Sequence, residues 1–259
     1  MIFVFNRVKM PANFTFARGC LCCLIVFNLM AATINAQQVN PDKSYNELIE
    51  ITEAFYGTDD VLVNGQKYIP GHFMADGHPY FPDETWTKGS VTMDGKLFEG
   101  IDLLYNAEID QLILRTILSR GDTVFVACNT AKVETFSIGG HTFTSLISHE
   151  TDQQFKGFYE EIYHGNFSFL IKHQKSFIAD YSKASPKGHF SKLNSTNFIF
   201  QSGQLTKVTN QKSFLNYFSQ NSKAIKAFMK KNKIRYATAN HSTMKLLLKY
   251  CDDLSSGKI

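Results

Sequence analysis

Short runs of alternating residues, separated by two-residue turns, constrain the fold of this chain more than any other feature. Asp94-Gly95 and Gly139-Gly140 each separate two runs rich in β-branched and aromatic residues. Such dipeptides tolerate the positive φ angles of the tight turns that join antiparallel strands. The pattern recurs at Asn64-Gly65 (between Val61–Val63 and Gln66–Ile69), His164-Gly165-Asn166 and Ser202-Gly203. We therefore predict a mainly β fold of the α+β class, an antiparallel hairpin meander that forms a barrel or a sandwich.

Helices are expected at both ends of this β region. Lys43–Phe55 carries apolar residues at helical spacing between acidic ones. Near the C-terminus, Asn221-Ser222 is typical of a helix start, and Asn240, His241 or Ser242 of a second one. The apolar stripes of these two helices are Ile225, Phe228 and Met229, and then Met244, Leu247, Leu248 and Cys251. We predict a C-terminal helical hairpin that covers an open edge or end of the sheet.

The first 36 residues resemble a secretory signal peptide. Met1–Arg18 is basic, Cys20–Ala32 is almost wholly apolar, and Ile34-Asn35-Ala36 offers a small residue at which signal peptidase would cut. We expect residues 1–36 to be removed and residues 37–259 to form a single β-rich domain, of which 211–259 is a basic helical segment. The mature chain would then be exported, to the periplasm, the outer membrane or the medium, with no transmembrane segment of its own. Two cysteines remain in the mature chain, Cys128 and Cys251. The sequence leaves open whether they form a disulfide.

Charge is distributed unevenly along the mature chain. Residues 37–180 contain 10 basic and 21 acidic residues, whereas 181–250 contain 13 basic and none acidic. On a helix, Lys223, Lys226 and Lys230 share one face. We expect this face to meet either an anionic envelope component or an acidic protein, or else the acidic half of the same chain. For an exported protein, nucleic acid is not an expected partner.

Motifs that carry chemistry are sparse. The chain contains no His-Glu-x-x-His, Gly-x-Ser-x-Gly or Cys-x-x-Cys motif and no phosphate-binding loop. His72 and His78 form the densest group of possible metal ligands, with Asp76, Asp83 and Glu84 beside them, but their spacing matches no recognised ligand set and an exposed loop is the simpler explanation. His141 and His164 are expected to be ordinary turn residues. Glu160 and Glu161 should point to opposite faces of a strand and cannot form an acid/base pair.

Aromatic side chains offer a second kind of candidate site. Phe73, Tyr80, Phe81 and Trp86 lie close together in the sequence and could line the mouth of a site for a sugar or an apolar ligand. Aromatic residues also build hydrophobic cores, where each of them buries a large apolar area. The sequence leaves both interpretations open for these four residues.

Motifs spread over most of the mature chain resemble those of a known family. Gly77-His78-Pro79-Tyr80-Phe81, Trp86, Gly89-Ser90-Val91 and Phe98-Glu99-Gly100-Ile101, with the Leu246–Tyr250 ending, are similar to a family of exported β-rich proteins common in Bacteroidota. The resemblance implies a β-rich exported domain and no defined activity. It assigns no catalytic residue and no cofactor.

These observations favour an exported soluble β-domain that works by binding or as a scaffold, without catalysis and without a cofactor. The sequence also allows two alternatives. One is a carrier that holds a lipid or a sugar inside a barrel. The other is a metal-assisted hydrolase that would use His72, His78, Asp76 or Glu84.

Overall fold

A computed structural model describes residues 65–117, 121–147 and 155–258. Three of the expected features lie outside these residues: the signal peptide of residues 1–36, the helix of Lys43–Phe55, and the Val61–Val63 half of the first hairpin. The other half of that hairpin appears as the short strand β1 (Gln66–Lys67), which pairs with β6.

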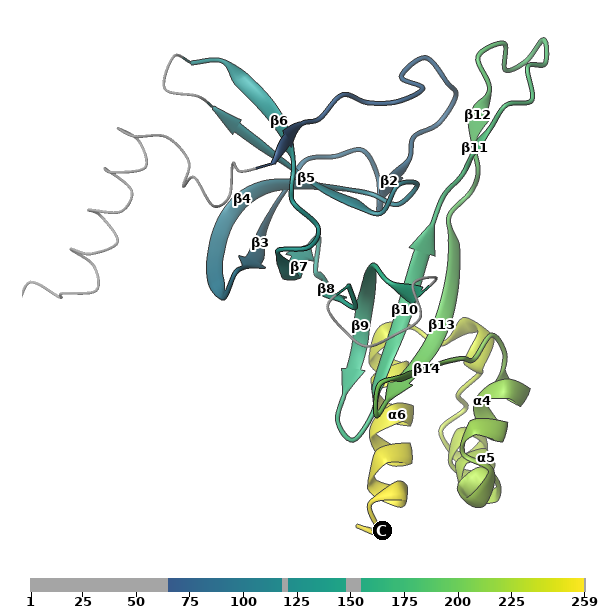
Figure 1. The fold of residues 1–259 in the computed structure, drawn as a ribbon. Helices are drawn as coiled ribbons and strands as arrows, with labels where there is room; N and C mark the ends of the chain where they lie inside the picture. The colour runs from purple at the N-terminus through teal and green to yellow at the C-terminus, as the bar shows by residue number, and fades with distance from the viewer. Residues whose placement is uncertain (1–64, 118–120, 148–154, 259) are drawn as a thin grey trace, which may run out of the picture. The chain divides into compact units, whose positions relative to one another are not determined.

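The described residues form one large antiparallel sheet and one small two-stranded sheet (Figure 1). No helix among them is long and apolar enough to cross a membrane. The strands after β1 are β2 (Tyr80–Phe81), β3 (Thr87–Met93), β4 (Lys96–Asn106), β5 (Gln111–Ile117), β6 (Thr123–Ala127), β7 (Val133–Ile138), β8 (His141–Ser145), β9 (Phe158–His164), β10 (Ser168–Gln174), β11 (Phe177–Ile178), β12 (His189–Phe190), β13 (Asn194–Gln201) and β14 (Gln204–Lys207).

The turn dipeptides join the strands that the sequence predicts. Asp94 and Gly95 connect β3 to β4 with φ angles of 49° and 75°, and Gly139 and Gly140 connect β7 to β8 with φ angles of 57° and 80°. Two successive positive φ angles are the requirement of a type I′ turn, which explains the residues found there. The hairpins β9–β10 and β13–β14 are also present.

Strand order in the large sheet is β1-β6-β5-β4-β3-β7-β8-β9-β10-β13-β14, with β2 paired to β4. Two meanders therefore leave a common seam between β3 and β7, one running toward β1 and the other toward β14. The prediction of a mainly antiparallel β fold is confirmed. The sheet is open in the described residues, with β1 and β14 at its two ends, so it does not close into the barrel that the sequence had allowed.

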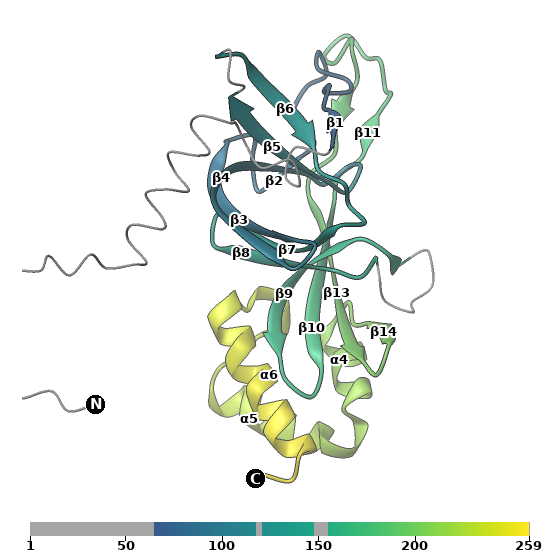
Figure 2. The ribbon, with the colours of Figure 1, turned by 60° about the vertical axis from the view of Figure 1, so that its left-hand side comes forward.

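Three helices follow the last strand, where the sequence predicted two. They are α4 (Gln211–Tyr217), α5 (Ser222–Lys231) and α6 (His241–Ser255). A capping box between Asn210 and Ser213 starts α4, and the Asn240 side chain accepts the backbone N–H of Thr243 at the start of α6. In both ribbon views α6 lies alongside β9 and β10 (Figure 2).

The buried apolar residues form two main cores, and β9 takes part in both. Phe158 belongs to the first core, in which Phe136 and Phe143 stack with ring centroids 4.6 Å apart. Ile162 belongs to the second core, which packs the strands β9, β10 and β13 against the helices. Glu160 lies between Phe158 and Ile162 on the same face of the strand, because alternate residues share a face. A carboxylate therefore stands where the two apolar cores meet.

Candidate metal centre

Glu160 is the charged group around which the candidate site is built. Its side chain is 2% exposed, and an ionised carboxylate at that depth is costly unless other groups pair with it. Three histidine side chains, His141, His173 and His241, surround it. Partners of this kind make a buried carboxylate tolerable, and they also form a set of possible metal ligands.

Strand register explains why two of these histidines reach Glu160. On the neighbouring strands, Glu160 faces Phe143 of β8 and Ile171 of β10. His141 and His173 each lie two residues from those direct partners, so they are diagonal neighbours on the same face. His241 arrives from elsewhere, because it is the first residue of α6, just after the capping Asn240.

The distances define a compact cluster. Nδ1 of His141 lies 2.6 Å from Oε1 of Glu160, and Nδ1 of His241 lies 3.6 Å from the same oxygen. Nε2 of His173 lies 2.7 Å from the other oxygen, Oε2. The remaining ring nitrogen of His173, Nδ1, lies 2.8 Å from the hydroxyl of Ser195 on β13. One carboxylate oxygen thus faces two histidines, and the second is held by His173.

Aromatic contacts hold the rings in place. Phe81 stacks on His173 with centroids 4.2 Å apart and meets His141 edge-on at 5.0 Å. The rings of His141 and His241 are perpendicular, with centroids 5.6 Å apart.

The pKa of the Glu160 carboxyl reflects two opposing effects. Burial by itself raises this pKa, but the hydrogen bonds from His173 and His141 outweigh burial and hold the pKa below its ordinary value. The carboxylate is therefore ready to act as an anionic ligand.

His141, Glu160 and His241 fit a transition-metal ion. Their ligand atoms all lie within 4.8 Å of one another, and among the residues that the structure describes no other group of three does so. Tetrahedral zinc with bonds of about 2.0–2.1 Å places its ligands about 3.3 Å apart. The two distances to Oε1, 2.6 and 3.6 Å, lie on either side of that spacing, so small side-chain movements suffice. We call these three residues the His-Glu-His site.

The histidines that the sequence favoured lie elsewhere. His72 stacks on Phe177 at 3.6 Å, and Nδ1 of His78 lies 3.2 Å from Nζ of Lys175. Burial and the lysine charge lower the pKa of His78. Neither histidine belongs to a group of three metal-ligand residues in the described part of the chain.

The four candidate ligand-binding aromatics are divided among three surroundings. Phe73 is 81% exposed, while Phe81 is buried in the first core. Tyr80 and Trp86 pack on a small separate cluster around Tyr68, where Trp86 also stacks on Phe125. The structure brings Tyr80 and Trp86 into one cluster and does not add Phe73 or Phe81 to it.

A serine, a histidine and a glutamate meet on the β9–β10 hairpin, but not in the order that nucleophilic catalysis needs. Ser168 Oγ and Glu161 Oε1 lie 2.9 and 3.1 Å from the same ring nitrogen, Nδ1 of His164. A catalytic triad uses one ring nitrogen for the serine and the other for the carboxylate. As expected, Glu161 faces a different environment from Glu160.

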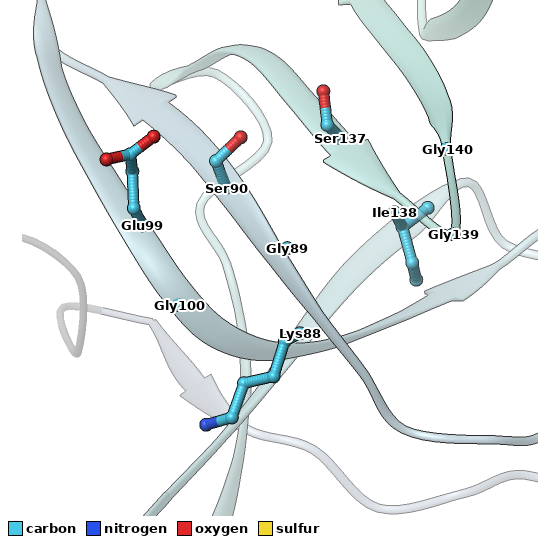
Figure 3. A pocket seen from close by; sticks show the side chains of 9 residues that line it. All are labelled: Lys88, Gly89, Ser90, Glu99, Gly100, Ser137, Ile138, Gly139 and Gly140. Carbon is cyan, nitrogen blue, oxygen red and sulfur yellow. The ribbon is translucent and has the colours of Figure 1, made fainter.

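A surface hollow of about 300 Å³ lies over β3, β4 and the β7–β8 turn (Figure 3). In the sheet register, Ser90 of β3 lies opposite Glu99 of β4 and Ser137 of β7. The side chains of these three residues extend from the sheet on the same side. Glycines form much of the remaining lining, and no histidine lines it. The hollow is shallow, its lining is both polar and apolar, and none of the three residues His141, Glu160 and His241 lines it.

Sequence reasoning missed the His-Glu-His site because its members are remote in the chain and match no spaced motif. His141 was expected to be an ordinary turn residue, and His241 appeared only as a possible helix cap. A usable signal was the charged Glu160 between the alternate apolar residues Phe158 and Ile162 of one strand, because a carboxylate on a buried face needs a partner. Comparisons of the chain with protein-family models, with curated proteins and with solved structures returned no match.

Proposed function

We propose that this is an exported protein that binds a divalent transition-metal ion, zinc fitting best, at His141, Glu160 and His241. One observation carries the proposal: ligand atoms from β8, β9 and the start of α6 converge within 4.8 Å on a buried carboxylate. Export is supported by the signal-like residues 1–36. The proposal thus assigns a specific ligand to the binding role expected from the sequence.

The choice of metal follows from the ligand types. Two imidazole nitrogens and one carboxylate oxygen suit zinc and its neighbours, whereas magnesium and calcium prefer oxygen ligands throughout. His173 supports the assignment from outside the ligand set, since ligating carboxylates in metal sites are themselves usually hydrogen-bonded.

Metal-assisted hydrolysis is a second candidate, favoured by the exposure of the site. The His241 side chain is 49% exposed and that of His141 27%, so a fourth coordination position would face solvent. Two histidines, one glutamate and a water form a ligand set known from catalytic zinc sites, where the metal lowers the pKa of the water to about 7. Turnover of a generic ester or peptide by the zinc-loaded protein, abolished by chelation, would establish this activity.

Zinc binding is tested by stripping the mature protein with a chelator, adding zinc and measuring bound metal by mass spectrometry after dialysis. We expect one zinc per chain in the wild type and loss of that zinc in His241→Ala. His241 suits the test because it is half-exposed, and the circular dichroism of the variant reports whether it folds. His78→Ala is the matched control and should keep its zinc. Zinc retained by His241→Ala and lost by His78→Ala would refute the proposal.

A further inference from the structure

Helix α5 carries a row of exposed lysines that are not part of either apolar core. Lys223, Lys226 and Lys230 are exposed, and we call these three residues the basic face. Ile225 and Met229, on another side of the helix, are buried in the second core. Because the apolar side of α5 is already covered, its basic side is the part left for a partner.

Acidic residues of the described chain do not neutralise this face. None of the ion pairs among the described residues includes a lysine of α5. Residues 211–258 contain ten basic and two acidic residues. Both acids are engaged elsewhere, Asp252 with Tyr163 and Asn166, and Asp253 with Lys249. The described residues therefore favour an external counter-charge over an internal one.

The residues at the start of α5 do not favour a stable helix. Its first turn has no acidic residue and no side-chain cap, although Lys223 lies next to the positive end of the helix dipole. Lys223 and Lys226 are three residues apart, and Lys226 and Lys230 four, so like charges face each other along the helix. Lys230 and Lys231 in the last turn do favour the helix dipole, so the departure from local helix rules is confined to the start of α5 and to the like-charge spacing, and such departures often mark a functional surface.

We propose that the basic face binds the surface of an anionic phospholipid bilayer. Clusters of four to eight lysines and arginines on an amphipathic helix are typical of such binding, and Lys231, Lys233 and Arg235 extend this cluster to six. The apolar residues of α5 are committed to the core, so the helix lies on the headgroups without inserting. Single-stranded nucleic acid is a poorer fit, because its bases stack on free aromatic rings and Phe228 already stacks on Tyr250 at 3.9 Å.

Vesicle sedimentation tests this inference with the whole mature protein. We expect binding to vesicles of phosphatidylcholine with about one-third phosphatidylglycerol at low salt, weakening as salt rises, and no binding to phosphatidylcholine alone. Lys223, Lys226 and Lys230 changed together to Gln should lower the affinity at least thirtyfold, since one lysine near an anionic surface contributes about fivefold. The matched control changes Lys183, Lys187 and Lys192, which are also exposed, to Gln.

Four outcomes would overturn the inference. They are equal losses in both triple variants, equal binding to neutral vesicles, binding of duplex DNA but not of vesicles, and a lower melting temperature of the α5 variant with unchanged vesicle binding. The last would make the lysines part of the internal structure. The proposed vesicle binding does not need the His-Glu-His site, so it should persist in chelator and in His241→Ala, and either proposal can fail alone.

Discussion

Nδ1 of His241 lies 3.6 Å from Oε1 of Glu160, which brings the first residue of α6 to a buried position on β9. A metal ion between these atoms would tie the C-terminal helix to the sheet at the place where the two apolar cores meet. An ion bound there would therefore also stabilise the folded state, because any ion that binds only the folded chain does so.

His173 should act as a positioning residue for the metal. Its Nε2 holds the second oxygen of Glu160 at 2.7 Å, while its ring stacks on Phe81. His173→Phe keeps a ring on Phe81 but removes the hydrogen bond, so we expect zinc affinity to fall about 10- to 100-fold with the stoichiometry unchanged. A competition titration against a chromophoric chelator measures this affinity.

Rescue by a conservative change separates this role from simple packing. The amide of Gln places a donor near the position of Nε2, so His173→Gln should recover most of the affinity that His173→Phe loses. If both variants bind zinc as tightly as the wild type, then His173 does not orient Glu160 for the metal.

Asp252 should make the stability of the helical segment depend on pH. Burial raises the pKa of its carboxyl, but hydrogen bonds from Tyr163 and Asn166 outweigh that effect and lower the pKa below its ordinary value. A depressed pKa in the folded state gives stability that is present above the unfolded-state pKa of about 3.9 and is lost as pH falls through the folded-state value.

Asp252→Asn should therefore lower the free energy of unfolding by about 2 kcal/mol at pH 7, the typical contribution of hydrogen bonds to a charged group. The difference from the wild type should shrink below about pH 4. Urea unfolding at a series of pH values measures both effects. Asp253→Asn is the control, since its i,i+4 pair with Lys249 is more exposed and contributes well under 1 kcal/mol. A difference that grows on acidification would contradict the assignment.

Truncation of two adjacent leucines of α6 should lower the stability of the protein to very different extents. Leu247 is fully buried in the second core, whereas Leu246 is 51% exposed. Leu247→Ala should lower the free energy of unfolding by about 3 kcal/mol, because it leaves a cavity. Leu246→Ala should change it by less than about 0.5 kcal/mol. Similar values for the two variants in chemical denaturation would contradict the packing of α6 on the sheet.

The two buried cysteines should resist alkylation while the protein is folded. Cys128 and Cys251 are unpaired thiols, and burial raises the pKa of each to about 12. Their thiolates are therefore scarce at neutral pH, and the thiolate is the form that reacts. Peptide mass spectrometry should find these two cysteines unmodified by iodoacetamide in native buffer and modified in denaturant. A disulfide-linked peptide joining them would show the structure to be wrong at these positions.

Much of the sheet could be predicted because its signals are local. Asp94-Gly95 and Gly139-Gly140 fix two hairpins by the backbone angles that these residues tolerate. The return from β6 to β7, which places β7 beside β3, has no such signal, and neither does the choice between an open and a closed sheet. Those features depend on contacts between residues remote in sequence.

The candidate site was beyond sequence reasoning for the same reason. The opposite orientations of Glu160 and Glu161 followed from strand geometry alone. Which side chains Glu160 would meet depended on the register of β8 and β10 and on where α6 begins. Proximity in sequence pointed to His72 and His78 instead, although nearby loop residues need not converge on one point.

Anomalous diffraction at the zinc absorption edge tests the metal centre most directly. Crystals of the mature protein grown with one equivalent of zinc should show a peak bonded to Nδ1 of His141, Nδ1 of His241 and a carboxylate oxygen of Glu160. The expected bond lengths are about 2.0–2.2 Å. An anomalous map with no peak at these three residues, or with its main peak at His72 or His78, would contradict the account.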